Sequence, residues 1–112
     1  MTGYDLINEI GDLTKLLNSS VAAYSRRGKE FAKAEYEYRV ALAQEIAKLR
    51  ADGNPVTIVP DMARGDKQVA RLRLDRDLKE VSFKAAGEAI QNYKLQIRVK
   101  DAQVQREWGD AK

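Results

Sequence analysis

The feature that most restricts the fold is a long series of apolar residues that recur every three or four positions and are interrupted by a single turn-forming segment. The series extends from about residue 4 to residue 51, where a turn-forming Asp-Gly-Asn-Pro sequence ends it. This spacing places the apolar side chains on one face of an α-helix. We therefore predict a helix over residues 4–51, roughly 70 Å long. Its apolar face contains Leu6, Ile10, Leu13, Leu17, Tyr24, Phe31, Tyr38, Leu42 and Leu49.

The start of this helix carries a capping signal, and its middle contains one weak point. Thr2 is placed to cap the first turn, and Asp5 lies at the positive end of the helix dipole. The Asn-Ser-Ser sequence at residues 18–20 has short polar side chains that compete for backbone hydrogen bonds. The helix either continues through this point or breaks there, in which case residues 4–17 fold back as a third helix.

The connector, residues 52–66, is too apolar for an exposed linker. We expect Thr57 to cap a short helix with Pro60 in its first turn, where a missing N–H does no harm. Gly65 is expected to end that helix and Asp66 to cap the next one. The Arg-Gly-Asp tripeptide at this point is therefore interpreted as a helix stop and start, not as an adhesion motif.

A second helix is predicted over residues 67–108, with Trp108 anchored near Tyr4. At 100° per residue, one side of this helix holds Leu74, Leu78, Val81, Ala85 and Ala89. The adjoining side holds Phe83, Ala86, Ile90, Tyr93, Ile97 and Val104. Together they cover roughly 200° of the helix, whereas a single two-helix seam needs about 100° or less.

The chain is thus predicted to be an all-α protein with one domain over residues 1–112, an antiparallel, coiled-coil-like helical hairpin with a short helical connector. Two helices alone lack the core that normally offsets chain entropy. The wide apolar arc therefore requires a further contact, and we expect a homo-oligomer in the form of a four-helix or larger bundle. The expected oligomer or partner surface consists of Phe83, Ile90, Tyr93, Ile97 and Val104.

The residue inventory argues against catalysis. With no His and no Cys, the chain lacks the commonest general base and the usual zinc ligands. Glu35 and Glu37 lie on different helix faces and do not converge on a metal or a glycosidic bond. We expect a protein that is not an enzyme and takes no cofactor, metal or small-molecule substrate. A basic leader and a long apolar run are both lacking, which favours a cytoplasmic protein without membrane contact.

Basic residues gather in two places in a chain of net charge +3. The run from Arg64 to Arg76 is interspersed with acids and is interpreted as a solvated helix start. The better candidate for nucleic-acid contact is a belt in the first helix, expected to lie opposite Tyr93 and Lys94. A tyrosine beside it would stack on a base while the cations bind phosphates; alternatively the tyrosines are core and the cations solvated. The belt consists of Arg26, Arg27, Lys29 and Lys33.

Three stretches of the sequence are distinctive: the run Tyr38–Ala43, the connector Pro55–Asp66 and the ending Arg106–Gly109. Within residues 25–109 they resemble a family of small proteins from tailed phages and prophages of Gram-positive bacteria. The resemblance implies a phage origin, in the cytoplasm of the bacterial host, and a gene among those for replication and recombination. The family has no catalytic residues to carry over.

The expected function is a non-catalytic accessory protein of phage DNA replication or recombination, acting as an oligomeric helical interaction module. Its partner would be DNA, a phage or host protein, or both. Two other classes stay open. One is an inhibitor that occupies the surface of a host or defence enzyme, and the other is a scaffold for virion assembly.

Overall fold

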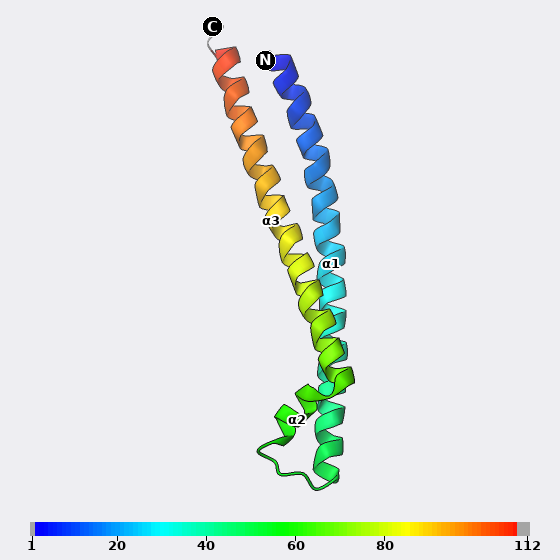
Figure 1. The fold of residues 1–112 in the computed structure, drawn as a ribbon. Helices are drawn as coiled ribbons and strands as arrows, with labels where there is room; N and C mark the ends of the chain where they lie inside the picture. The colour runs from blue at the N-terminus through cyan, green and yellow to red at the C-terminus, as the bar shows by residue number, and fades with distance from the viewer. Residues whose placement is uncertain (1, 110–112) are drawn as a thin grey trace. The chain divides into compact units, whose positions relative to one another are not determined.

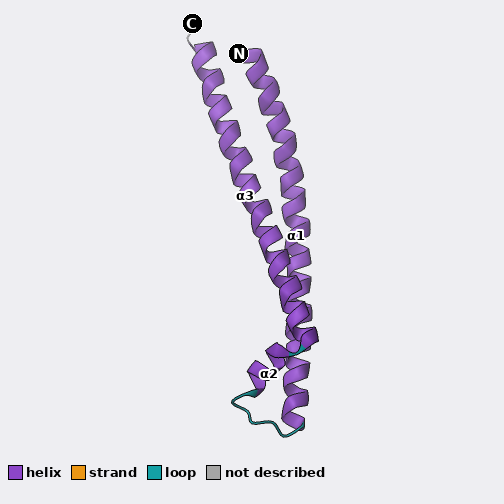
Figure 2. Ribbon diagram, in the orientation of Figure 1, coloured by secondary structure: helices purple, strands orange, loops and turns teal. Residues whose placement is uncertain are grey.

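The computed structural model describes residues 2–109, which form three helices. Helix α1 spans Gly3–Ala51, α2 spans Val59–Gly65 and α3 spans Lys67–Gly109. The long helices α1 and α3 pack together as a hairpin, with α2 in the connector (Figures 1 and 2). The predicted all-α hairpin is confirmed, and residues 2–109 contain no strand. None of the helices in this range combines the length and apolar character that crossing a bilayer requires.

The chain divides into two units, which we describe separately. Unit 1 comprises residues 1–26 and 84–112, and unit 2 comprises residues 27–83. Each unit therefore holds a stretch of α1 and a stretch of α3, and unit 2 also holds the connector with α2.

Helix α1 begins with the predicted cap. The Thr2 hydroxyl accepts a hydrogen bond from the backbone N–H of Asp5 at 3.2 Å, and the Thr2 N–H donates to the Asp5 carboxylate at 3.3 Å. This reciprocal pair satisfies amide groups that a helix start leaves without partners. Residues 18–20 do not interrupt α1, because packing of an amphipathic face outweighs local propensity. The alternative in which residues 4–17 fold back is therefore wrong.

Helix α1 ends where the sequence predicts, through a glycine in the left-handed region. Gly53 has a φ of +86°, and its N–H donates to the Arg50 carbonyl at 3.0 Å. The backbone N–H and the side-chain amide of Asn54 both donate to the Leu49 carbonyl, at 3.2 and 2.9 Å. These bonds satisfy carbonyls that the last helical turn leaves open.

The short helix α2 starts differently from the prediction. The cap position is Ile58, which makes no side-chain capping bond, so the prediction that Thr57 caps this helix is wrong. The N–H groups of Ile58 and Val59 instead donate to the Pro55 carbonyl, at 3.1 and 3.2 Å, which leaves no role for a hydroxyl cap. Pro60 does lie in the first turn, as predicted. The connector is packed, because Val59 and Ala63 are buried.

The cap of α3 confirms the stop-and-start interpretation of the Arg-Gly-Asp tripeptide. Helix α2 ends at Gly65, and the Asp66 carboxylate then accepts hydrogen bonds from the N–H groups of Gln68 and Val69, each at 3.1 Å. Val69, which follows directly, is one of the most deeply buried side chains of unit 2. The cap therefore sets the first residue of α3 and places Val69 on the side of the helix that packs.

One set of buried and half-buried side chains of α3 follows alternating steps of three and four residues. In unit 2 they are Val69, Leu72, Arg76, Lys79 and Phe83, and in unit 1 they are Ala86, Ile90, Tyr93, Ile97, Lys100 and Val104. This alternation is the 3.5-residue repeat of a coiled-coil seam. We call this set the seam of α3. Three of its members are charged, which distinguishes it from a purely apolar seam.

Contacts within each unit establish the pairing of the two long helices. In unit 2 the Phe31 and Phe83 ring centroids lie 6.0 Å apart, and a Cβ built on Gly28 would lie 2.9 Å from the Phe83 ring. In unit 1 a Cβ on Gly87 would lie 3.2 Å from the Tyr24 ring. The Trp108 indole lies against Gly3, next to Tyr4, as predicted.

This pairing corrects the predicted register. The stretch around Gly28 was expected opposite Tyr93 and Lys94, but it lies against Phe83. That expectation placed the turn of the hairpin near Val59, whereas the position of Gly28 against Phe83 places it earlier in the sequence. The residues of α3 opposite Gly28 are therefore nearer the N-terminus of α3 than expected.

Removal of the α3 cap provides a test of the connector. Asp66→Ala should lower the free energy of unfolding by about 1 kcal/mol, because two amide groups lose their acceptor. Thr57→Ala is the matched control and should leave stability unchanged, since Thr57 caps nothing. Urea unfolding followed by circular dichroism measures both. Equal losses in the two variants would contradict the assigned caps.

Two glycines of α1 test the close approach of the helices. Gly11 has open space around its Cβ position, so Gly11→Ala should raise the free energy of unfolding by about 0.5–1 kcal/mol. Gly28→Ala should gain less or lose stability, because the added methyl group meets the Phe83 ring. The same urea titration compares them. An equal gain at both positions would show that Phe83 does not pack on Gly28.

Candidate interaction surfaces

The four residues of the predicted basic belt differ in exposure. Arg27 is half-buried and its Nη1 donates to the Ser82 carbonyl at 3.4 Å, within the packing of unit 2. Lys33 pairs with Glu37 at 3.9 Å between Nζ and Oε1. Arg26 and Lys29 are exposed. Arg26, Lys29 and Lys33, whose side chain is 78% exposed, therefore stay candidates for contact with a phosphate, whereas Arg27 is taken up by the packing of unit 2.

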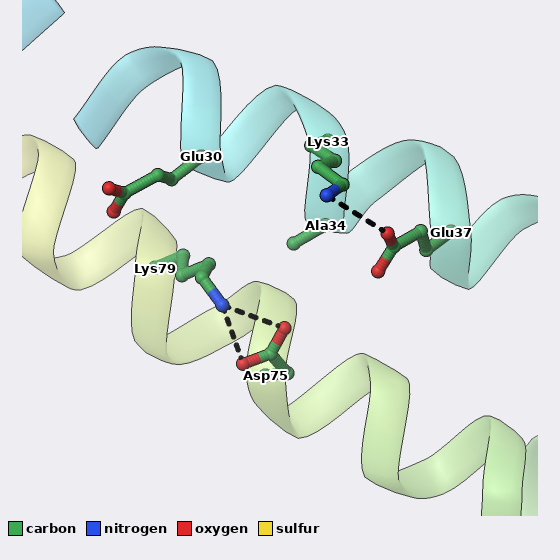
Figure 3. Close-up of a pocket in the computed structure, with 6 residues that line it drawn as sticks. All are labelled: Glu30, Lys33, Ala34, Glu37, Asp75 and Lys79. Atoms are coloured by element: carbon green, nitrogen blue, oxygen red, sulfur yellow. Dashed lines mark hydrogen bonds and ion pairs between the residues drawn. The ribbon is translucent and has the colours of Figure 1, made fainter. Parts of the chain in front are cut away.

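A shallow charged hollow of about 180 Å³ lies between the α1 and α3 stretches of unit 2 (Figure 3). Its lining residues are Glu30, Lys33, Ala34, Glu37, Asp75 and Lys79. The Lys79 ammonium bonds both oxygens of Asp75, at 2.9 and 3.0 Å. The hollow therefore holds carboxylates and ammonium groups that already pair with one another.

The electrostatics of the hollow are those of a structural ion network. The pKa of Lys79 is raised, chiefly by its hydrogen bond to Asp75. Desolvation is the next largest effect and opposes the rise, while attraction to Asp75, Glu30 and Glu37 adds to it. Within residues 2–109 no group of three or more metal-binding side chains is arranged to hold an ion. We assign no ligand to the hollow.

A second polar cluster of unit 2 surrounds Arg76, a seam residue that sequence analysis placed in a solvated run. That placement is wrong. Only 19% of the Arg76 side chain is exposed, and its guanidinium carbon lies 4.7 Å from the centre of the buried Tyr38 ring. It pairs with Glu35 at 3.2 Å and with Asp77 at 2.7 Å. Steps of seven residues back from Phe83 lead to Arg76 and then to Val69, and this repeat is the sequence signal that could have identified Arg76 as inward-facing.

The cluster shifts the acidity of its members in the direction expected of ion pairs. The hydrogen bond from Arg39 and the positive charges of Arg76 and Arg39 hold the pKa of Glu35 below its usual range, with desolvation opposing. The hydrogen bond to Asp77 is the largest of the effects that raise the pKa of Arg76. A guanidinium over a tyrosine ring can bond carboxylates with its N–H groups without leaving the seam.

The predicted partner surface lies in a different place from the most exposed apolar side chains. Its members, Phe83, Ile90, Tyr93, Ile97 and Val104, are all half-buried and follow the seam spacing. The exposed apolar residues of α3 in unit 2 are Leu74, Leu78 and Val81, with 60%, 61% and 66% of their surface accessible. In unit 1 they are Leu95, Val99 and Trp108, at 54%, 51% and 57%, and Trp108 lies against Gly3. We call Leu74, Leu78 and Val81 the unit 2 stripe, and Leu95 and Val99 the unit 1 stripe.

Both stripes were part of the apolar arc found in the sequence or lay beside it, but their outward position was not recognised. The choice between the two sides of the arc depends on which side faces α1, and single-sequence periodicity does not decide this. The half-burial of Phe83 and Ile90 shows that α1 covers their side of the arc.

Comparison with known proteins finds no relative whose structure or function could be compared with this protein. No family model matches the chain, no curated protein matches it, and no solved structure matches it.

The lowered pKa of Glu35 gives a pH-dependent test of the Arg76 cluster. A carboxylate with a depressed folded-state pKa stabilises the fold above its unfolded pKa, and this contribution is lost as pH falls through the folded pKa. Glu35→Gln should therefore be less stable than wild type at pH 7, with the difference shrinking below about pH 4.

Thermal unfolding of both proteins from pH 7 to pH 3 measures this difference. Glu107→Gln, an exposed change near the end of α3, is the control and should track wild type throughout. A constant deficit of Glu35→Gln at every pH would show that the loss is one of packing and not of charge.

Proposed function

We propose that this protein is a non-catalytic helical interaction module that self-associates through the outer surface of α3. The observation that carries the proposal is the exposure of Leu74, Leu78 and Val81, each about two-thirds open to solvent on a helix whose other side already packs on α1. Single exposed apolar residues are ordinary, but a run at helical spacing is typical of an interface.

The hydrophobic effect favours covering these exposed side chains. Covering an exposed Leu or Val side chain is worth up to about 1.5–3 kcal/mol, as an upper bound for complete burial. A hairpin of two helices leaves this gain unused, because its two helices cover each other on only one side. A second helical layer would bury the outer side of α3 and supply the wider core that a small domain needs.

We place the module in phage DNA replication or recombination. The support for this setting is the resemblance of residues 25–109 to small phage and prophage proteins, together with two exposed cations, Arg26 and Lys29, on α1. In this proposal the assembled module brings several copies of these cations to a nucleic-acid backbone, and the summed contacts give a salt-dependent affinity. Inhibition of a host enzyme and virion scaffolding are the competing outcomes of the test below.

Light scattering on the purified chain, with and without single- and double-stranded DNA over a salt series, tests assembly and DNA binding together. The proposal predicts a mass above the 12.6 kDa of one chain, and DNA binding that weakens as salt rises. A single-chain mass at all concentrations would overturn self-association. An oligomer without DNA affinity at low salt would overturn the DNA role and favour a protein partner.

Charge reversal identifies the phosphate contacts. Arg26→Glu with Lys29→Glu should weaken DNA binding at least about ten-fold and reduce the salt slope, because both cations lose their phosphates. Lys15→Glu with Arg106→Glu makes the same change of net charge at two other exposed positions and is the matched control. Equal losses in the two double variants would indicate an effect of net charge alone. Fluorescence anisotropy with a labelled oligonucleotide measures both.

A further inference from the structure

The two exposed stripes of α3 share the spacing of the seam. Leu74, Leu78 and Val81 are separated by steps of four and three, and Leu95 and Val99 by a step of four, with the exposed Ala102 three further on. Side chains at these steps pack between those of a facing helix that has the same repeat. The surface that fits the unit 2 stripe is therefore another helix with outward apolar residues at heptad spacing. The unit 1 stripe has this pattern.

We infer that the unit 2 stripe binds the unit 1 stripe of a second copy of this chain, with the two α3 helices antiparallel. In the register that matches large residues, Leu78 packs on Leu95 of the second copy and Leu74 packs on Val99 of the second copy. The inference rests on the self-association proposed above and adds the surface, the partner and the orientation.

Charge complementarity selects the antiparallel orientation. Asp77 directly precedes Leu78, and Arg98 directly precedes Val99, so both exposed charges lie on the same flank of their stripes. In an antiparallel pair, residues of the same flank face each other, and Asp77 meets Arg98 of the second copy. A parallel pair would place these two charges opposite the uncharged Gln103 and Ser82, with no attraction.

The residues between the stripes agree with the same register. Glu88 is exposed and interrupts the apolar spacing. With Leu78 opposite Leu95, Glu88 lies opposite Ala85 of the second copy and not opposite a second Glu88. A shifted alignment that placed Glu88 opposite Glu88 of the second copy would bring like charges together at the middle of the contact. The register with Leu78 opposite Leu95 avoids this repulsion.

Cysteine cross-linking tests the contact cleanly, because the chain has no cysteine of its own. Leu78→Cys and Leu95→Cys proteins are prepared separately and oxidised alone or as an equal mixture. The inference predicts a disulfide-linked dimer in the mixture, joined between the two variants, and little in either protein alone. Cross-linking of each variant with itself would indicate a parallel, in-register pair and would overturn the inference.

A charge swap provides a second measurement that does not alter apolar packing. Arg98→Asp should raise the dimer dissociation constant at least about ten-fold, and adding Asp77→Arg should recover most of that loss. Lys94→Asp makes the same charge change at an exposed position outside both stripes and should leave the constant unchanged. Because Asp77 also contacts Arg76, circular dichroism of the double variant must match wild type before the recovery is scored.

The outcomes separate this inference from the proposed function. A chain that sediments as a single copy at every concentration contradicts self-association itself. A chain that dimerises without any Leu78→Cys to Leu95→Cys cross-link leaves self-association standing and overturns only the surface and orientation assigned here.

Discussion

The packing of α1 against α3 along a 3.5-residue repeat is the interaction on which the rest of the structure depends. Neither helix has a core of its own, so each is stabilised by the face that it buries against the other. In unit 2 this face includes the Phe31–Phe83 contact and the close approach at Gly28. In unit 1 Glu9 and Lys100 are bridged at 2.7 Å across the helices. The caps and turns then determine which residues meet.

Charged residues inside the seam restrict that pairing further. Arg76 bonds Glu35 on the facing helix while lying against Tyr38. Sliding one helix by a turn would separate Arg76 from Glu35 and Tyr38 and leave the half-buried guanidinium with only Asp77 of its own helix, which is unfavourable. An apolar seam alone tolerates such slips more easily. The polar cluster therefore contributes more to the choice of register than to overall stability.

Much of the fold could be predicted from the sequence because its signals are local. The Thr2 cap, the left-handed Gly53 and the Asp66 cap each depend on residues a few positions apart. The register, the start of α2 and the position of Arg76 could not be predicted in the same way. They depend on where the chain reverses, and that is settled by the packing of Val59 and Ala63 and by the Pro55 carbonyl.

The candidate interaction surface was harder to predict from the sequence, because it also depends on how the two long helices pair. Both sides of the α3 arc are equally apolar in sequence, and only the position of α1 decides which side is left open. The structure places Phe83 and Ile90 in the seam and leaves Leu74 and Leu78 exposed. A helix with apolar residues on two sides needs two contacts, and the hairpin supplies one. Assembly through the open side is the function that we propose for this geometry.

Labelling of individual side chains by a diffusible carbene, at low and high protein concentration, tests most directly whether the chain assembles through the outer side of α3. We predict that labelling of Leu74, Leu78, Leu95 and Val99 falls as concentration rises, whereas the exposed Tyr36 of α1 stays fully labelled. Unchanged labelling of the four α3 residues at concentrations where the chain is oligomeric would contradict the claim that the outer side of α3 is the assembly surface.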